Sequence, residues 1–99
     1  PKQALLCGDL NFPAAAPERM QILAPFTAGV PNFNDAWSVL HPGQVHAPTV
    51  GIHPVDFVDR PECFDYVFIT DGLVSHLKAH GIDATTEASD HQPIWVELA

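Results

Sequence analysis

Basic residues are scarce in this sequence. Four lysines and arginines stand against twelve aspartates and glutamates, and the 99 residues carry a net charge of −8 with the histidines neutral. Proteins that bind along a nucleic-acid backbone use clustered Lys and Arg, so this balance argues against broad phosphate contact by this chain alone. It leaves room for one phosphate ester or one metal ion, because a local cation can outweigh the overall charge.

Cysteines and long apolar runs are few as well. The two cysteines, Cys7 and Cys63, lie in strand-like apolar runs, which favours buried free thiols over a disulfide or a metal pair. No run approaches the ~18 apolar residues that span a bilayer, so the sequence predicts no membrane span. The chain starts at Pro1 rather than at Met, and we expect it to be the downstream part of a longer protein.

Apolar residues, by contrast, are plentiful for a chain of one-domain length. Hydrophobic residues make up 46% of the sequence and charged residues 16%. A domain of this size buries only somewhat more than the ~60% of chain surface expected for 60 residues. Much apolar surface is therefore left to cover, which indicates that a partner surface is missing.

Two apolar stretches predict strands at the centre of a sheet. Residues 4–8 form a short continuous apolar run that fits a strand buried on both faces and ending at Gly8. Residues 62–70 are aromatic and β-branched and predict a second central strand. Residues 91–98 alternate apolar and polar side chains and predict a final strand, whereas residues 73–83 fit either a helix or a strand.

Short helices and one long loop are expected between these strands. Pro17 and Glu18 suit the first turn of a helix. Backbone N–H groups there have no partner within the helix, so proline loses no hydrogen bond, and an acidic side chain interacts favourably with the helix dipole. Asn34 is expected to cap a short helix over residues 35–40. Residues 44–61 are rich in proline and predict an irregular surface loop with a short extended piece at residues 49–52.

Polar side chains interrupt this apolar scaffold at three places. Because ligand sites in α/β sheets gather at strand ends, we expect these side chains to converge. Asp9 and Asn11 follow the first predicted strand, and Asp65 lies inside the second. Ser89, Asp90 and His91 come at the start of the last.

Asp65 is the most unusual of these polar residues. It stands between Phe64 and Tyr66 in a predicted buried strand, where an unpaired carboxylate costs several kcal/mol. We therefore expect a histidine partner and select His91; the structural alternative is that loop amides donate hydrogen bonds to Asp65. A carboxylate behind an imidazole fixes its tautomer and stabilises its positive form, which suits a histidine that donates a hydrogen bond to a phosphoryl oxygen or a leaving group.

Oxygen ligands for a metal ion are present beside this pair. Asp9, Asp90 and the amide of Asn11 offer the hard oxygen atoms that Mg²⁺ or Mn²⁺ and a polarised water require. Metal-assisted hydrolysis is the reaction class that these groups indicate. The alternative is structural, because Asp, Asn and Ser side chains also accept hydrogen bonds from backbone N–H groups in turns, here at residues 9–11 and at residues 89–90.

Several motifs occur in an order that resembles a known family. They are CGDLN at residues 7–11, DAW at residues 35–37, FDYVFIT at residues 64–70 and SDHQPI at residues 89–94. Together they resemble the C-terminal half of the endonuclease/exonuclease/phosphatase family, which has the DNase I-like fold, and the resemblance covers nearly all of residues 1–99. It implies half of a four-layer α/β sandwich, as one mostly antiparallel sheet with short helices on one face.

The resemblance also implies roles for the polar residues. Asp9 would position or activate the attacking water, and Asn11 would hydrogen-bond the scissile phosphate. Asp90 would hold the metal together with Asp9, while His91, oriented by Asp65, would contact the phosphate and stabilise charge in the transition state. The family's metal-binding Asn and Glu belong to an N-terminal half that these residues do not contain, which predicts either that missing half or self-association through an exposed apolar sheet face.

We therefore expect a Mg²⁺- or Mn²⁺-dependent phosphoesterase that hydrolyses a phosphodiester or phosphomonoester with an activated water, as part of a longer chain. The acidic balance favours small or lipid-derived phosphates over DNA. The alternative is a non-catalytic half-domain that binds or self-associates. A zinc site at His76 and His80 is a third hypothesis, which requires a helix, because a strand would separate the two residues by about 13 Å.

Overall fold

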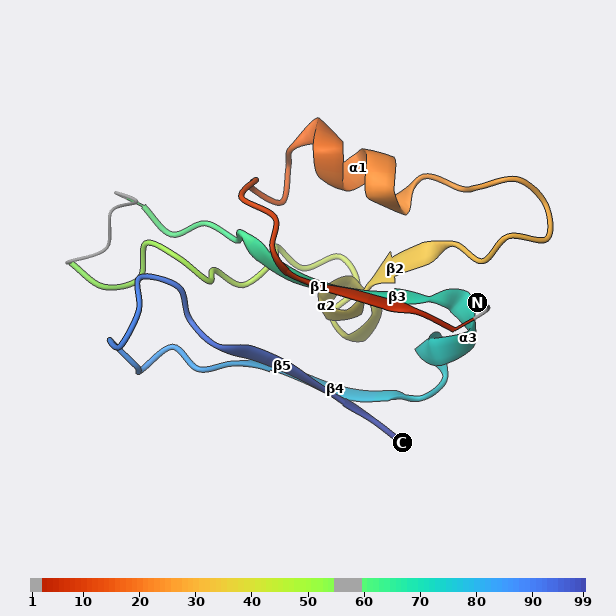
Figure 1. Ribbon diagram of the computed structural model, residues 1–99. Coiled ribbons are helices and arrows are strands. Elements are labelled where there is room, and N and C mark those ends of the chain that lie inside the picture. Colours follow the sequence, from red (N-terminus) through yellow and green to blue (C-terminus); the bar gives the residue numbers. More distant parts are fainter. Residues whose placement is uncertain (1–2, 55–59) are drawn as a thin grey trace.

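The computed structural model describes residues 3–54 and 60–99, and these form a mixed α/β domain with two antiparallel sheets and three short helices (Figure 1). The larger sheet has the strand order β1-β3-β2, and β4 pairs with β5 in the smaller one. The expectation of a single sheet is therefore wrong. In chain order the elements are β1 (Leu5–Asp9), α1 (Pro17–Leu23), β2 (Phe33–Asp35), α2 (Ala36–Leu40), β3 (Asp65–Thr70), α3 (Asp71–Val74), β4 (Leu77–Ile82) and β5 (Ile94–Leu98).

Strand β3 is the centre of the fold and is buried along its whole length. Because side chains alternate along a strand, Tyr66 and Phe68 belong to one apolar cluster, while Val67 and Ile69 belong to another. The predicted central strand is confirmed, although it begins at Asp65 rather than three residues earlier.

The two apolar clusters lie on opposite faces of the larger sheet. Side chains of α1 pack with Tyr66 and Phe68, whereas side chains of α2, α3 and β5 pack with Val67 and Ile69. Figure 1 shows α1 on one side of β1, β3 and β2, with β4 and β5 on the other. The expectation of helices on one face only is therefore wrong, because the same buried strand needs apolar cover on both sides.

Strand β1 lies at an edge of the larger sheet, with β3 as its neighbour. All five of its residues are exposed, Leu5 at 42% and Leu6 at 37%. The prediction of a central strand buried on both faces is wrong, and so is the predicted burial of Cys7. Cys63 is buried as predicted, and both cysteines are free thiols. An apolar run alone does not distinguish a central strand from an apolar edge strand.

The helices begin close to where the sequence predicts them. Helix α1 has Pro17 in its first turn, followed by Glu18. Helix α2 is capped by Asp35, whose Oδ1 accepts the backbone N–H of Trp37 at 3.0 Å, so the prediction of Asn34 as the cap is wrong by one residue. No helix within residues 3–54 and 60–99 is long and apolar enough to cross a membrane.

The segment that fits either a helix or a strand in the sequence is a strand, β4, preceded by the single turn of α3. His76 lies before β4, and its Nδ1 donates to the backbone oxygen of Ala99 at 2.7 Å. His80 lies within β4, with its ring 5.7 Å from that of Trp37. The helical spacing that a shared zinc ion requires is absent from residues 76–80, so the zinc hypothesis is wrong.

Strand β5 confirms the predicted alternation of the last strand. Ile94 and Val96 pack on the apolar cluster around β3. Trp95 points away and is 51% exposed, with its indole ring against Gly81 of the neighbouring strand. The register position of Trp95 places it on the outer face of β5.

A buried carboxylate, Asp35, connects α1 to the loop that follows α2. Its Oδ2 accepts from Nη2 of Arg19 at 2.9 Å and lies 3.6 Å from Nε2 of His46. Burial raises the pKa of Asp35, but the hydrogen bonds and charges of His46 and Arg19 outweigh this effect, and the pKa lies below its usual value. Burial lowers the pKa of His46, but hydrogen bonds to Asp35 and Cys63 raise it to about 10. Asp35 is therefore an anion between two cations.

Gly51 lies in a turn where a side chain does not fit. Its φ is +71°, and a Cβ atom would overlap the carbonyl of Arg60. Gly43 has a similar φ of +75° with nothing within 4 Å of a Cβ position. We expect Gly43→Ala to lower the free energy of unfolding by about 1–2 kcal/mol, the cost of left-handed backbone. Gly51→Ala should cost about 1–3 kcal/mol more, because the chain must move to accept the methyl group.

Urea denaturation of the two variants measures this difference. Equal losses of stability at the two positions would contradict the close approach of Gly51 to Arg60.

Candidate functional site

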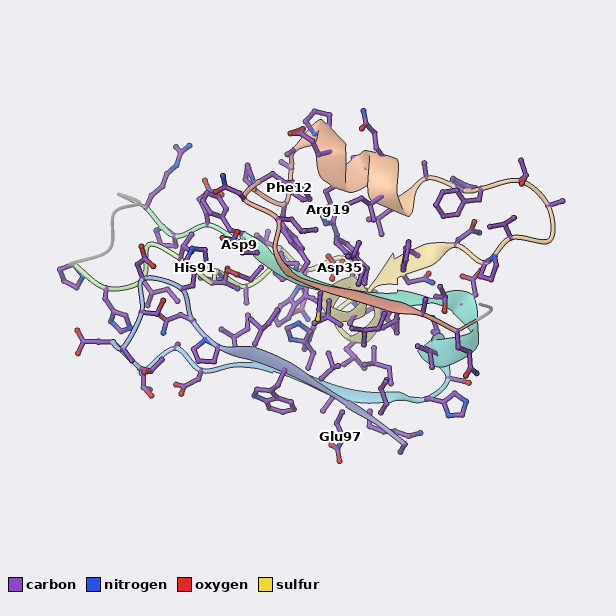
Figure 2. All side chains as sticks on the ribbon, in the orientation of Figure 1. Asp9, Phe12, Arg19, Asp35, His91 and Glu97 are labelled. Atoms are coloured by element: carbon purple, nitrogen blue, oxygen red, sulfur yellow. The ribbon has the colours of Figure 1, made fainter. Side chains whose placement is uncertain are left out.

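Three of the predicted site residues meet at one end of β1 and β3. The register of these two strands places Asp9 opposite Asp65. His91 precedes β5, and one ligand atom from each of Asp9, Asp65 and His91 lies within 4.8 Å of the others. Figure 2 shows Asp9 and His91 close together at the end of the sheet away from the two termini.

Backbone contacts of the loop after α2 bring His91 to the start of β3. Val50 forms isolated antiparallel bridges with both Glu62 and His91. The next residue to His91, Gln92, donates its backbone N–H to the carbonyl oxygen of Thr49 at 2.7 Å. Residues 49–50 therefore hold together the two segments that lead into β3 and β5.

Asp65 and His91 form the carboxylate–imidazole pair that the sequence predicts. Nδ1 of His91 lies 2.9 Å from Oδ2 and 3.1 Å from Oδ1 of Asp65. Because a carboxylate only accepts hydrogen bonds, Nδ1 carries the proton. The opposite ring nitrogen, Nε2, lies 3.6 Å from Oδ2 of Asp9. The imidazole is thus held between a buried carboxylate and a carboxylate that is 48% exposed.

The charges around His91 favour its positive form. Burial lowers the pKa of His91, but the hydrogen bond to Asp65 and the negative charges of Asp65, Asp9 and Asp90 raise it, and the net shift is upward from the usual value. The side chain is 25% exposed, so solvent or a ligand reaches it. A positive imidazole at the surface is suited to an anionic group such as a phosphate.

Asp9 makes both a structural contact within its turn and a contact with the site residue His91. Its Oδ1 accepts the backbone N–H of Asn11 at 2.8 Å, in a turn where Asn11 has a φ of 58°. Its Oδ2 faces His91. The Asn11 side chain is exposed and lies outside the three-residue group. Its contact with a phosphate stays a prediction.

Asp90 lies beside the group rather than in it. Its Oδ1 lies 3.5 Å from Oγ of Ser89, and the same Oγ accepts the backbone N–H of His91 at 3.1 Å. Ser89 therefore has the structural role in a turn. Among the described residues, the possible metal-binding group joins Asp9 to Asp65 and His91 and does not include Asp90. The predicted metal role of Asp90 stays a prediction.

Asp9 is the accessible oxygen ligand of this group. Oδ2 of Asp65 already accepts from Thr49 at 2.6 Å and from His91 at 2.9 Å, and the Asp65 side chain is 11% exposed. Mg²⁺ binds proteins through one or two carboxylates and keeps several waters or phosphate oxygens. An exposed Asp9 carboxylate fits that requirement as one ligand.

The sequence interpretation missed Thr49, which is fully buried next to Asp65. It predicts residues 44–61 as an irregular surface loop, of which residues 55–59 lie outside the described residues. No motif marks Thr49, because a single threonine between proline and valine carries no periodic signal.

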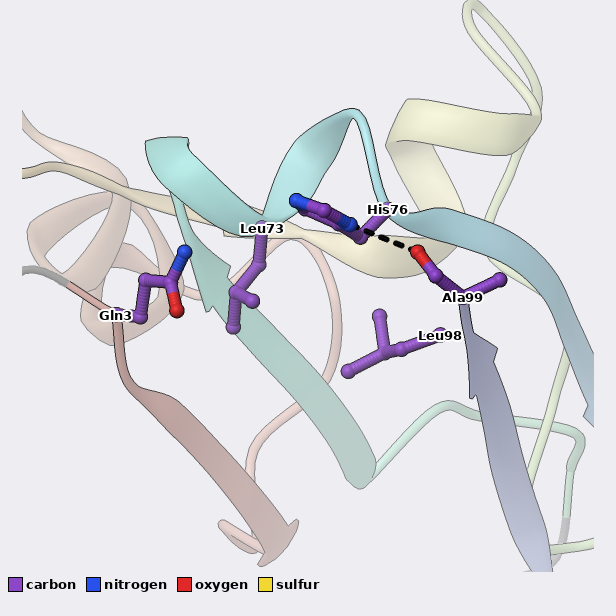
Figure 3. A pocket seen from close by; sticks show the side chains of 5 residues that line it. All are labelled: Gln3, Leu73, His76, Leu98 and Ala99. Carbon is purple, nitrogen blue, oxygen red and sulfur yellow. Dashed lines mark hydrogen bonds between the residues drawn. The ribbon is translucent and has the colours of Figure 1, made fainter.

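A separate hollow of about 230 Å³ lies near the chain ends (Figure 3). His76 is its one titratable side chain, and the hydrogen bond to Ala99 holds it. No second titratable side chain among these lining residues could share a proton with it. The lining residues are Gln3, Leu73, His76, Leu98 and Ala99.

In comparisons with known proteins, no protein-family model and no curated sequence matches this chain. Membership of the endonuclease/exonuclease/phosphatase family therefore stays a prediction, and the geometry around His91 supplies the functional argument.

Proposed function

We propose that this chain carries the site of a divalent-metal-dependent phosphoesterase of the endonuclease/exonuclease/phosphatase type. The observation that supports it best is the position of His91, with Asp65 on Nδ1 and Asp9 on the side of Nε2. An imidazole whose inner nitrogen is fixed by a carboxylate presents its outer nitrogen to a ligand in one orientation.

The residues suit hydrolysis of a phosphate ester. As a water oxygen attacks phosphorus and the bond to the leaving oxygen breaks, negative charge grows on the phosphoryl and leaving oxygens. The positive ring of His91 stabilises that charge, and Asp65 keeps the ring charged and oriented. The exposed Asp9 carboxylate accepts the proton of the water. Mg²⁺ or Mn²⁺, held by Asp9 with help from Asp90, would supply further positive charge at the phosphate.

The proposal includes a surface partner. Leu5 and Leu6 are exposed on the β1 edge, as half of a four-layer sandwich would leave them without its other half. Covering this edge by the family's N-terminal half would also bring the metal ligands that the present residues do not supply.

The test is hydrolysis of bis(p-nitrophenyl) phosphate by the 99-residue chain with Mg²⁺ or Mn²⁺ and with EDTA, together with Mn²⁺ binding measured by electron paramagnetic resonance. We expect Mn²⁺ binding by this chain, and turnover that EDTA abolishes once self-association or the N-terminal half completes the centre. Asp9→Asn keeps an oxygen for the turn but loses the charge, and should weaken Mn²⁺ binding by about 10-fold or more. Glu97→Gln removes one exposed carboxylate from β5, away from the site (Figure 2), and should change neither property.

The possible outcomes separate the proposal from its failure. Mn²⁺ binding that depends on Asp9, without turnover, would mean that a second chain completes the centre. A folded chain with neither turnover nor Mn²⁺ binding would contradict the proposal.

A second candidate function, a non-catalytic module that self-associates, is favoured by the exposed β1 edge. An unpaired edge strand with apolar side chains is a template for pairing with another strand. Sedimentation velocity over a range of concentrations distinguishes this candidate. A reversible dimer that Leu6→Lys removes would support it, and a monomer at every concentration would contradict it.

A further inference from the structure

We propose that Thr49 is a positioning residue of this site, whose hydroxyl fixes the Asp65 carboxylate that orients His91. Its effect on rate rests on the proposed function, whereas its effect on the imidazole does not. Thr49 belongs to the loop after α2, outside every motif that marks the other site residues.

The hydroxyl of Thr49 has one orientation. Oγ1 accepts the backbone N–H groups of Phe64 at 3.0 Å and of Asp65 at 3.3 Å, and it lies 2.6 Å from Oδ2 of Asp65. Because a hydroxyl has one proton and two lone pairs, the two N–H groups use its acceptor sites and the proton goes to the carboxylate. A short hydrogen bond to a charged oxygen is among the stronger ones in proteins.

The carboxylate in turn depends on that hydroxyl. Oδ2 of Asp65 accepts from both Thr49 and Nδ1 of His91, so the three groups form a chain of hydroxyl, carboxylate and imidazole. With the hydroxyl present, rotation of the Asp65 carboxylate would break two hydrogen bonds, one to Thr49 and one to His91. Without the hydroxyl, the same rotation would break only the one to His91. The orientation of the ring would then be free to change.

The backbone of Thr49 fixes the same geometry from a second side. Its N–H donates to the carbonyl oxygen of Glu62 at 2.8 Å, and its carbonyl oxygen accepts the N–H of Gln92 at 2.7 Å. Glu62 lies three residues before Asp65, and Gln92 directly follows His91. Thr49 therefore stands between the two segments that the carboxylate–imidazole pair joins, and it is 0% exposed.

The test compares Thr49→Val, which keeps the shape and removes the hydroxyl, with Thr49→Ser, which keeps the hydroxyl. The ¹⁵N chemical shifts of the neutral His91 ring, recorded in EDTA, report which nitrogen carries the proton. We expect the Nδ1–H form in the wild type and in Thr49→Ser, and a shift toward the Nε2–H form in Thr49→Val. A residue that merely stabilises the fold would leave this tautomer unchanged.

Kinetics give the second readout. We expect kcat for bis(p-nitrophenyl) phosphate to fall about 10-fold or more in Thr49→Val with KM little changed, and Thr49→Ser to stay within about threefold of the wild type. Absence of both turnover and Mn²⁺ binding in all three proteins would count against the proposed function and leave the tautomer result intact. A folded Thr49→Val that keeps the Nδ1–H form would overturn the role of Thr49. If Thr49→Val does not fold, the serine variant decides, because loss of the Nδ1–H form despite a hydroxyl would overturn it too.

Discussion

Replacing His91 with glutamine is expected to lower metal-dependent phosphodiester hydrolysis by about 100-fold or more without unfolding the protein. The ring is 25% exposed and lies at the surface end of β1 and β3, so few packing contacts depend on it. Glutamine can donate a hydrogen bond but cannot become positive, and it therefore loses the charge that opposes the growing negative charge on phosphate.

A matched histidine provides the control for this variant. His76 is exposed and hydrogen-bonded to Ala99 (Figure 3), the last residue, which lies away from Asp9 and His91 (Figures 1 and 2), so His76→Gln removes an imidazole that the site does not use. We expect its rate to equal that of the wild type. A rate for His91→Gln within about threefold of the wild type would remove His91 from the mechanism.

Asp65→Asn should lower the rate by a similar factor for a related reason. An amide can donate as well as accept, so it no longer requires a proton on Nδ1 of His91, and the ring loses its fixed tautomer. Because the two residues act as one unit, the double variant should be no slower than His91→Gln alone. Fully additive losses in the double variant would show that Asp65 and His91 act separately.

The Asp65–His91 pair could be predicted because its physical reason is local. A carboxylate inside an aromatic and β-branched strand is costly without a partner, and that cost is legible in the sequence FDYVF. The burial of β3 on both faces follows from the same run of residues, and the structure confirms it.

The contacts that bring Asp65 and His91 together were not predictable in the same way. His91 reaches Asp65 through the bridges of Val50 to two segments far apart in the chain, and Thr49 acts through a single hydroxyl. The sequence predicts a short extended piece at residues 49–52, but neither the segments with which it pairs nor the contact of the Thr49 hydroxyl. The exposure of β1 likewise depends on which strands neighbour it, a property of the sheet order rather than of its own residues.

The predicted cap of α2 was wrong by one residue, and this small error conceals the role of Asp35. Placed one position later than the expected cap, its carboxylate accepts the N–H of Trp37 with one oxygen and bonds Arg19 with the other. The Asp35 side chain therefore both caps α2 and forms a buried ion pair with Arg19. The sequence offers no means to see this, because Arg19 and His46 are distant in the chain.

Asp35→Asn is accordingly expected to lower the free energy of unfolding by about 3–5 kcal/mol, because it leaves the Arg19 guanidinium without an anion and removes the carboxylate that favours the charged form of His46. Small domains are stable by roughly 5–15 kcal/mol, so this loss is a large fraction of the total. Urea denaturation measures it. Glu97→Gln, which removes one exposed carboxylate (Figure 2), is the control and should leave the midpoint nearly unchanged.

A double variant tests the mechanism of that loss. Arg19→Met removes one buried cation while keeping an apolar side chain of similar length, so it should recover part of the stability lost in Asp35→Asn. Losses that add in the double variant would mean that Arg19 and Asp35 contribute independently, contrary to their contact at 2.9 Å.

The pH dependence of stability isolates the contribution of the pair between His46 and Asp35. His46 has a folded pKa of about 10, above its ordinary value of 6.5, so its pairing with Asp35 contributes fully below pH 6.5 and is lost as the pH rises through 10. Asp35 has a folded pKa below 3.8, so its contribution is present above pH 3.8 and is lost in more acidic solution. The stability gap between the wild type and Asp35→Asn should therefore narrow between about pH 6.5 and about pH 10. A constant gap would mean that the pair with His46 contributes nothing, and that the cap to Trp37 and the ion pair with Arg19, neither of which titrates in this range, account for the whole effect.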